Sequence, residues 1–193
     1  MIYIACCFRS GTIYLQRLMK RYGVSLGQEV IKWQGMVGCP LTMVREKGIV
    51  QTLKNHPPMA AVIREPHACI SSMCWRTAKL VYRMADVLET RPGGETPWGE
   101  KDTDAWKHTV QAQFWLEWNR DMLGTGCPLF RLEDLQDLRV QQKLLDAVGV
   151  DKPATIYPYD PASHNAGHPV EELLVDPAVM AQCEDIWRGV SHG

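Results

Sequence analysis

The sequence predicts an α/β fold, a three-layer sandwich with a mostly parallel central sheet. Three observations support this prediction: short apolar runs of strand length alternate with longer segments of helical periodicity, polar residues follow each apolar run directly, and no repeat interrupts the pattern. Strands buried on both faces of a parallel sheet have this appearance. Ligands of such sheets bind beyond the carboxyl ends of the strands.

Four short apolar runs are the predicted strands: Ile2–Phe8, Ile49–Leu53, Met59–Ile63 and Leu129–Leu132. The apolar spacing also predicts helices, the first over Tyr14–Tyr22, with Gly23 placed to end it. A long helix is expected over Ala68–Leu88, with Pro66 in its first turn. Three more run from the N-cap Asp104 to Met122, over Gln136–Val148 up to Gly149, and from Asp176 and Pro177 to Trp187.

Composition limits the class of protein. The 193 residues are expected to form one domain, residues 1–193, and 21 basic against 22 acidic side chains disfavour nucleic acid as a partner. No apolar run reaches the about 18 residues that a membrane span needs, and the N-terminus lacks a signal-peptide pattern. The odd number of cysteines, with Cys6 and Cys7 adjacent in an apolar run, indicates buried thiols in a reducing compartment. We therefore expect a cytoplasmic protein with no membrane partner.

The turn Phe8-Arg9-Ser10-Gly11-Thr12, between the first strand and the first helix, is a candidate anion site. It combines the free N–H groups of a helix N-terminus with an arginine and two hydroxyls. The GxxxxGK(S/T) spacing of a Walker A loop is absent, which disfavours a P-loop ATPase. The alternative is that Ser10 and Thr12 only cap the helix and that Gly11 only turns the chain.

This loop, continued by Ile13-Tyr14-Leu15, resembles the 5′-phosphosulfate loop of the cytosolic and Golgi-type sulfotransferases, whose pattern is K/R-S-G-T-T-x-L. The resemblance implies a P-loop NTPase-like fold of sulfotransferase type. It also implies a co-substrate, 3′-phosphoadenosine 5′-phosphosulfate, whose 5′ end is held by Arg9, Ser10, Gly11, Thr12 and Ile13. Ile13 departs from the pattern, because the family often has a second hydroxyl there.

The segment Val62-Ile63-Arg64-Glu65-Pro66, with Ser72 eight residues beyond the arginine, resembles the 3′-phosphate site of the same family. An arginine at a strand end offers phosphate a two-pronged hydrogen bond, and a serine in the next helix can face the same cavity. The resemblance implies that Arg64 and Ser72 share the 3′-phosphate. The alternative is that Arg64 pairs with Glu65 or another carboxylate.

Lys54-Asn55-His56-Pro57-Pro58 resembles the K-T-H-x-P segment of the family at the end of a strand, although Asn55 replaces the usual threonine. The resemblance implies that His56 is the catalytic base and that Lys54 contacts the donor. Transfer to an alcohol requires removal of the acceptor proton, and imidazole titrates near neutral pH. Lys54 and Arg9 would meet the charge on the departing phosphate oxygen. The alternative is that His56 is a surface loop residue.

The helix with Trp106, followed by Phe130-Arg131-Leu132-Glu133-Asp134-Leu135, resembles a tryptophan-bearing helix and a Y/F-x-x-E-D-L strand end of the family. Capping or a structural ion pair is the simpler interpretation of Glu133 and Asp134. Burial in the core is the simplest interpretation of Trp106, Trp115 and Trp118, and stacking of one of them on an adenine is the alternative.

The resemblance spans about residues 1–148, whereas the C-terminal R-K-G-x-x-G-x-W segment of the family has no clear counterpart, and Pro153–Pro169 is irregular. The predicted function is transfer of a sulfuryl group to a hydroxyl or amine of a small molecule or glycan, without a metal. Acceptor walls are expected in Gln28–Arg45 and Thr90–Thr103. Zinc at His164 and His168 is disfavoured, because a Pro/Gly-rich segment lacks the helix that would aim both rings at one ion.

Two alternatives to this function remain. One is a nucleotide-binding or interaction protein on the same fold that has lost transfer activity. The other is a different phosphate-loop transferase, such as a small kinase, against which the absent Walker lysine argues.

Overall fold

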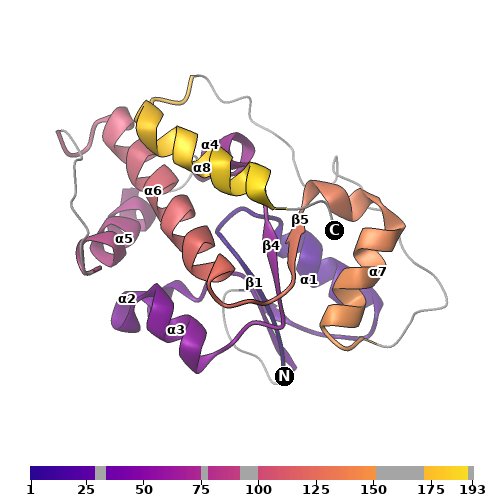
Figure 1. Cartoon of the computed structure of the whole chain (residues 1–193). Coiled ribbons are helices and arrows are strands. Elements are labelled where there is room, and N and C mark those ends of the chain that lie inside the picture. The colour runs from indigo at the N-terminus through magenta and orange to yellow at the C-terminus, as the bar shows by residue number, and fades with distance from the viewer. Residues whose placement is uncertain (29–33, 75–77, 92–99, 151–171, 191–193) are drawn as a thin grey trace.

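A five-stranded parallel sheet lies between two layers of helices (Figure 1). The computed structural model describes residues 1–28, 34–74, 78–91, 100–150 and 172–190. The strand order is β2-β3-β1-β4-β5, and every pairing is parallel within the described residues. The predicted α/β architecture with a parallel sheet is therefore confirmed.

The strands are short, and their register brings all carboxyl ends to one edge of the sheet. Ile4 pairs with Val37 on one side and with Ala60 on the other, and Ile63 pairs with Arg131. The strands are β1 (Ile2–Cys6), β2 (Gly27–Gln28), β3 (Gly35–Val37), β4 (Ala60–Ile63) and β5 (Leu129–Arg131). Neither β2 nor β3 was predicted, because strands of two or three residues are too short to show a period.

Eight α-helices and one 3₁₀ helix occur in the described residues. They are α1 (Thr12–Arg21), α2 (Leu41–Lys47), α3 (Ile49–Asn55), α4 (Pro66–Cys74), α5 (Ala78–Glu89), α6 (Asp104–Leu123), η1 (Glu133–Gln136), α7 (Leu138–Ala147) and α8 (Pro177–Gly189). Asp176 caps α8 as predicted, whereas the N-cap of α6 is Thr103 rather than Asp104. None of these helices is long and apolar enough to cross a membrane.

The prediction of a strand at Ile49–Leu53 is wrong, because this segment forms helix α3. Ile49, Thr52 and Leu53 are buried, whereas Val50 and Gln51 are exposed, which is the spacing of one helical face. A run of five residues is too short for periodicity to distinguish a buried strand from a helix. Within the long helix expected over Ala68–Leu88, the structure describes α4 as far as Cys74 and α5 from Ala78 on, and residues 75–77 lie outside the described ranges.

Side chains of β1 alternate between two buried layers. Ile4 and Cys6 pack in the cluster that contains the apolar face of α1, whereas Tyr3, Ala5 and Cys7 pack in the cluster that contains α4 and α6. The helices that follow β1 and β4 therefore lie on opposite faces of the sheet. This reversal makes the carboxyl ends of β1 and β4 the expected position of a ligand.

The predicted irregular segment Pro153–Pro169, which includes His164 and His168, lies outside the described residues, as does most of Thr90–Thr103. Within the described ranges, no group of three or more His, Cys, Asp or Glu side chains is placed to hold a metal ion.

Candidate functional site

The loop after β1 contains two residues in the left-handed backbone region, Arg9 with φ 63° and Gly11 with φ 84°. A Cβ at Gly11 would lie 2.5 Å from Cδ1 of Leu132, so the loop passes close to the side chain that follows β5, and the left-handed backbone at Gly11 also favours glycine. Gly11 is the N-cap of α1 and supplies no capping side chain, and the first turn contains no acidic residue. The first N–H groups of α1 are therefore left for an anion.

Arg9 connects this loop to helix α4. Its Nε donates a hydrogen bond to Oγ of Ser72 at 2.8 Å. Because the serine oxygen accepts this bond, the hydroxyl proton of Ser72 is left to donate to another group. The structure thus brings together one residue of the predicted 5′ site and one of the predicted 3′ site.

Arg64 approaches the same loop from the end of β4. Its Nη1 donates to the carbonyl oxygen of Arg9 at 2.9 Å, and the residue is only 9% exposed. Two guanidinium groups therefore meet at one loop, above the ends of β1 and β4. Positive charge gathered in a buried place favours an anionic ligand.

Ser10 is fully buried behind the loop rather than open to a ligand. Its Oγ lies 3.3 Å from Sγ of Cys69, whose thiol donates to the carbonyl oxygen of Phe8. Although burial raises the pKa of the Cys69 thiol, hydrogen bonds with Cys7 and Ser10 and the charge of Arg64 give it a lowered pKa. The Ser10 side chain therefore supports the loop from behind.

Thr12 has a partner that sequence reasoning missed. Nε2 of Gln28, at the end of β2, donates to Oγ1 of Thr12 at 3.2 Å. The hydroxyl proton of Thr12 is thereby left to donate, as at Ser72. Because β2 has only two residues, no pattern in the sequence predicted that Gln28 would lie beside Thr12. Ile13, 39% exposed, has only its backbone N–H to offer an anion.

His56 and Lys54 lie at the opposite edge of the sheet from this loop. His56 is the C-cap of α3 and precedes β4, and the N–H of Met59 bonds to the carbonyl oxygen of Tyr3 near the start of β1. Figure 1 shows the chain entering β4 from the end of the sheet at which the N-terminus lies. The length of β1, five residues or about 16 Å, separates this position from the loop.

The assignment of His56 as base required Ile49–Leu53 to be a strand that ends at the carboxyl edge, and this segment is a helix. The strand that lies on the other side of β1 from β4 is β3, and it is followed by buried Gly38, Cys39 and Pro40. The structure therefore does not bring Lys54 or His56 together with Arg9.

Replacing His56 with alanine is expected to leave both nucleotide affinity and any sulfuryl transfer within about twofold of wild type, since surface changes remote from a site have small effects. Calorimetric titration and a turnover assay of His56→Ala check this expectation. A loss of turnover of a hundredfold or more would restore the base assignment.

The tryptophan-bearing helix is part of the core. Trp106, Trp115 and Trp118 of α6 are at most 3% exposed, which agrees with the core interpretation and leaves none of these rings open to an adenine. At the end of β5, Oε1 of Glu133 accepts the backbone N–H of Glu65 at 3.2 Å. Glu133 therefore connects the ends of β4 and β5.

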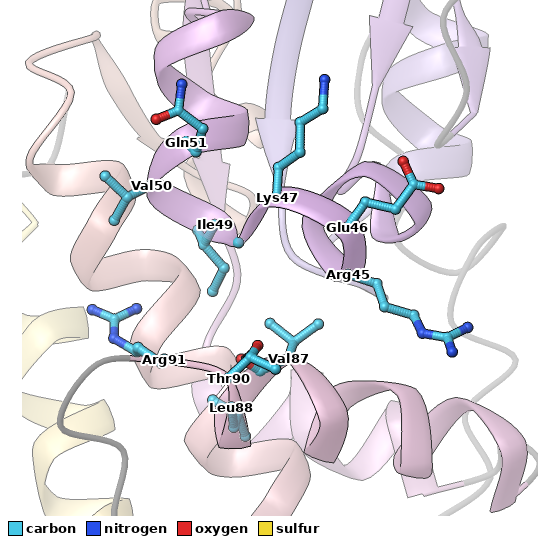
Figure 2. Close-up of a pocket in the computed structure, with 11 residues that line it drawn as sticks. Arg45, Glu46, Lys47, Ile49, Val50, Gln51, Val87, Leu88, Thr90 and Arg91 are labelled. Carbon is cyan, nitrogen blue, oxygen red and sulfur yellow. Dashed lines mark hydrogen bonds between the residues drawn. The ribbon is translucent and has the colours of Figure 1, made fainter.

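A separate cavity of about 610 Å³ lies between the α2–α3 junction and the end of α5 (Figure 2). The side chains of Arg45, Glu46 and Lys47 extend away from the space between Ile49 and Val87 (Figure 2). Arg91, also at this cavity, is held by two hydrogen bonds to Asp121, of 2.6 and 2.9 Å. The charged side chains around this cavity thus do not converge on one point, whereas those at the loop after β1 do.

Comparison with protein-family models, curated proteins and solved structures gives no significant match. Support for a function therefore comes from the residues of this chain alone.

Proposed function

We propose that the chain is a sulfotransferase on a P-loop NTPase-like fold, which binds 3′-phosphoadenosine 5′-phosphosulfate and transfers its sulfuryl group to an acceptor hydroxyl or amine. The observation that carries this proposal is the convergence of Arg9, Arg64 and Ser72, through the 2.8 Å and 2.9 Å contacts, at the reversal point of the sheet. These residues belong to the two segments that resemble the phosphate sites of the family.

The polarity of the site suits a ligand with phosphate-type groups. Both hydroxyls, of Ser72 and Thr12, already accept a hydrogen bond from a side-chain N–H, so each has a proton to donate to an anionic oxygen. The N-terminus of α1 and the Arg9 guanidinium would hold the 5′ end. Arg64 and Ser72 would hold the 3′-phosphate. Bonds of this kind to charged groups contribute about 1.5–3 kcal/mol each.

In the proposed transfer, the acceptor oxygen or nitrogen forms a bond to sulfur while the bond from sulfur to the 5′-phosphate oxygen breaks. The leaving phosphate takes the electron pair, and Arg9 stabilises its developing charge. Positioning and charge stabilisation supply the rate, as in phosphoryl transfer. His56 has no part in this step, and the acceptor proton passes to solvent or to a group on the acceptor.

The direct test is to incubate the protein with 3′-phosphoadenosine 5′-phosphosulfate and a panel of alcohols, amines and glycans, and to measure the bisphosphate and sulfated products by mass spectrometry. Transfer above the rate of an Arg9→Ala variant supports the proposal. Tight binding of the bisphosphate without transfer to any acceptor would instead favour the second candidate, a binding protein without transfer activity. The placement of Lys54 and His56 at the far edge favours that candidate.

Ser72→Ala is expected to weaken binding of adenosine 3′,5′-bisphosphate by about 10- to 100-fold, the loss of one hydrogen bond to a charged group. Binding of adenosine 5′-monophosphate should change little, because that nucleotide has no 3′-phosphate. Ser71→Ala is the matched control, since the neighbouring residue is turned by about 100° around α4. Equal losses for both nucleotides, by titration calorimetry, would contradict the assignment of Ser72.

A further inference from the structure

Glu133 lies at the base of the site and has one oxygen without a hydrogen-bond partner. Oε1 accepts the backbone N–H of Glu65, the residue after Arg64, at 3.2 Å. Oε2 is buried and has no partner within the described part of the chain. Leu132, the residue before it, packs against Gly11. The carboxyl group is thus held between the loop and the strand end that carries Arg64.

The charged and titratable neighbours of Glu133 come from two elements. Arg64 and Glu65 lie at the end of β4, and Cys69 lies on α4. Toward α7, η1 meets the uncharged Gln141, whose Nε2 donates to the carbonyl oxygen of Leu135. Arg64 is therefore the positive charge in this group.

Glu65 and Glu133 differ in their surroundings. Glu65 caps α4, since its two oxygens accept the N–H groups of His67 and Ala68 at 3.0 and 2.6 Å. Burial and the charge of Glu65 raise the pKa of Glu133, although the N–H of Glu65 and the charge of Arg64 oppose the rise. Glu133 is therefore a carboxyl group whose surroundings favour its protonated form.

We propose that Glu133 balances the charge of Arg64 while the site is empty and takes up a proton when a phosphate or sulfate group is bound at Arg64. With the site empty, the Glu133 carboxylate balances the Arg64 charge. A dianion on the other side of the same guanidinium repels the carboxylate across a poorly solvated space, and a proton from the buffer on Oε2 removes this repulsion. The inference rests on the proposed function only in requiring an anion at Arg64.

The sign of the effect follows directly. An anion that binds better when Glu133 is protonated raises the pKa of Glu133 in the complex. The affinity for the anion therefore increases as the pH falls through the range between the pKa of Glu133 in the complex and its pKa in the free protein. Phosphate groups themselves gain a proton near pH 6, which acts in the opposite direction. Sulfate stays a dianion throughout and therefore reports on the protein alone.

The test is a ¹³C NMR pH titration of glutamate side-chain carboxyls, in which the Glu133 signal is identified by its loss in Glu133→Gln. Spectra are compared in sodium chloride, in sodium sulfate of equal ionic strength, and with adenosine 3′,5′-bisphosphate. We expect both anions to raise the titration midpoint of Glu133 by about one unit. Affinities measured at about pH 8 should be roughly tenfold higher for Glu133→Gln than for wild type, the counterpart of that shift.

Asp134→Asn removes the same charge one residue later and is the matched control. A midpoint that sulfate and the bisphosphate leave unchanged would overturn the inference, and so would equal affinity changes in Glu133→Gln and Asp134→Asn. A midpoint that sulfate raises, in a protein that does not bind the bisphosphate, would uphold the inference and contradict the proposed nucleotide site. If Glu133 had a purely structural role, Glu133→Gln would bind the anions more weakly than wild type, and that result would also overturn the inference.

Discussion

Replacing Gly11 with alanine is expected to lower the free energy of unfolding by about 2–5 kcal/mol and to abolish anion binding at the loop. Two costs combine: a left-handed backbone at φ 84° costs an L-residue about 1–2 kcal/mol, and the new Cβ would lie 2.5 Å from Leu132. Overpacking of this kind costs about 1–3 kcal/mol. Relief requires either the buried Leu132 side chain or the loop to move, and movement of the loop would disperse the N–H groups at the start of α1.

Gly23→Ala is the matched control for this prediction, because Gly23 has a similar φ of 77° but nothing lies within 4 Å of its Cβ position. The free energy of unfolding of Gly23→Ala should fall only by the cost of the left-handed backbone, about 1–2 kcal/mol, and its affinity for anions should stay that of the wild type. Urea denaturation of both variants provides the comparison. Equal losses of stability and equal anion affinity in the two variants would contradict the close approach of Leu132 to the loop.

Arg64→Ala is expected to weaken binding of adenosine 3′,5′-bisphosphate by at least about 30-fold, since truncating one partner of a buried charge pair costs about 2–5 kcal/mol. The variant loses the guanidinium and also the donor to the Arg9 carbonyl oxygen. Arg64→Lys keeps the positive charge but lacks the planar guanidinium, so its affinity for the bisphosphate should lie between those of the wild type and Arg64→Ala. Arg139→Ala removes an exposed arginine of α7, whose side chain is 92% exposed, and should bind as wild type.

Loss of folding could mimic loss of binding in Arg64→Ala, because Glu133 then stays buried without its counter-charge. The double variant Arg64→Ala/Glu133→Gln removes that unpaired charge. We expect it to be more stable than the single variant and still unable to bind the bisphosphate. Recovery of nucleotide affinity in the double variant would contradict a direct contact between Arg64 and the ligand.

Elements with a helical period or a bounded apolar run could be predicted from the sequence, whereas β2, β3 and α3 could not. The apolar faces of α1 and α7 repeat over three turns, and β1, β4 and β5 begin as apolar runs bounded by polar residues. The segment Ile49–Leu53 has the composition of a strand, and only its packing against neighbouring helices shows it to be a helix.

The strand predicted at Ile49–Leu53 also decided where His56 was expected to lie. Parallel strands bring their carboxyl ends to one edge, so the position of His56 depended entirely on whether a strand or a helix precedes it. Arg9, Arg64 and Ser72 were predicted, because each follows a correctly identified strand. The inward direction of Ser10 and the contact of Gln28 with Thr12 depend on side-chain packing, for which the sequence has no local pattern.

The most direct test of a bisphosphate site is calorimetric titration of the wild-type protein with adenosine 3′,5′-bisphosphate and with adenosine 5′-monophosphate. The difference between the two isolates the 3′-phosphate contacts of Arg64 and Ser72. We expect the bisphosphate to bind at least about 100-fold more tightly, from two charge-assisted hydrogen bonds of about 1.5–3 kcal/mol each. Equal affinities, or no binding of either nucleotide, would contradict a bisphosphate site at the ends of β1 and β4.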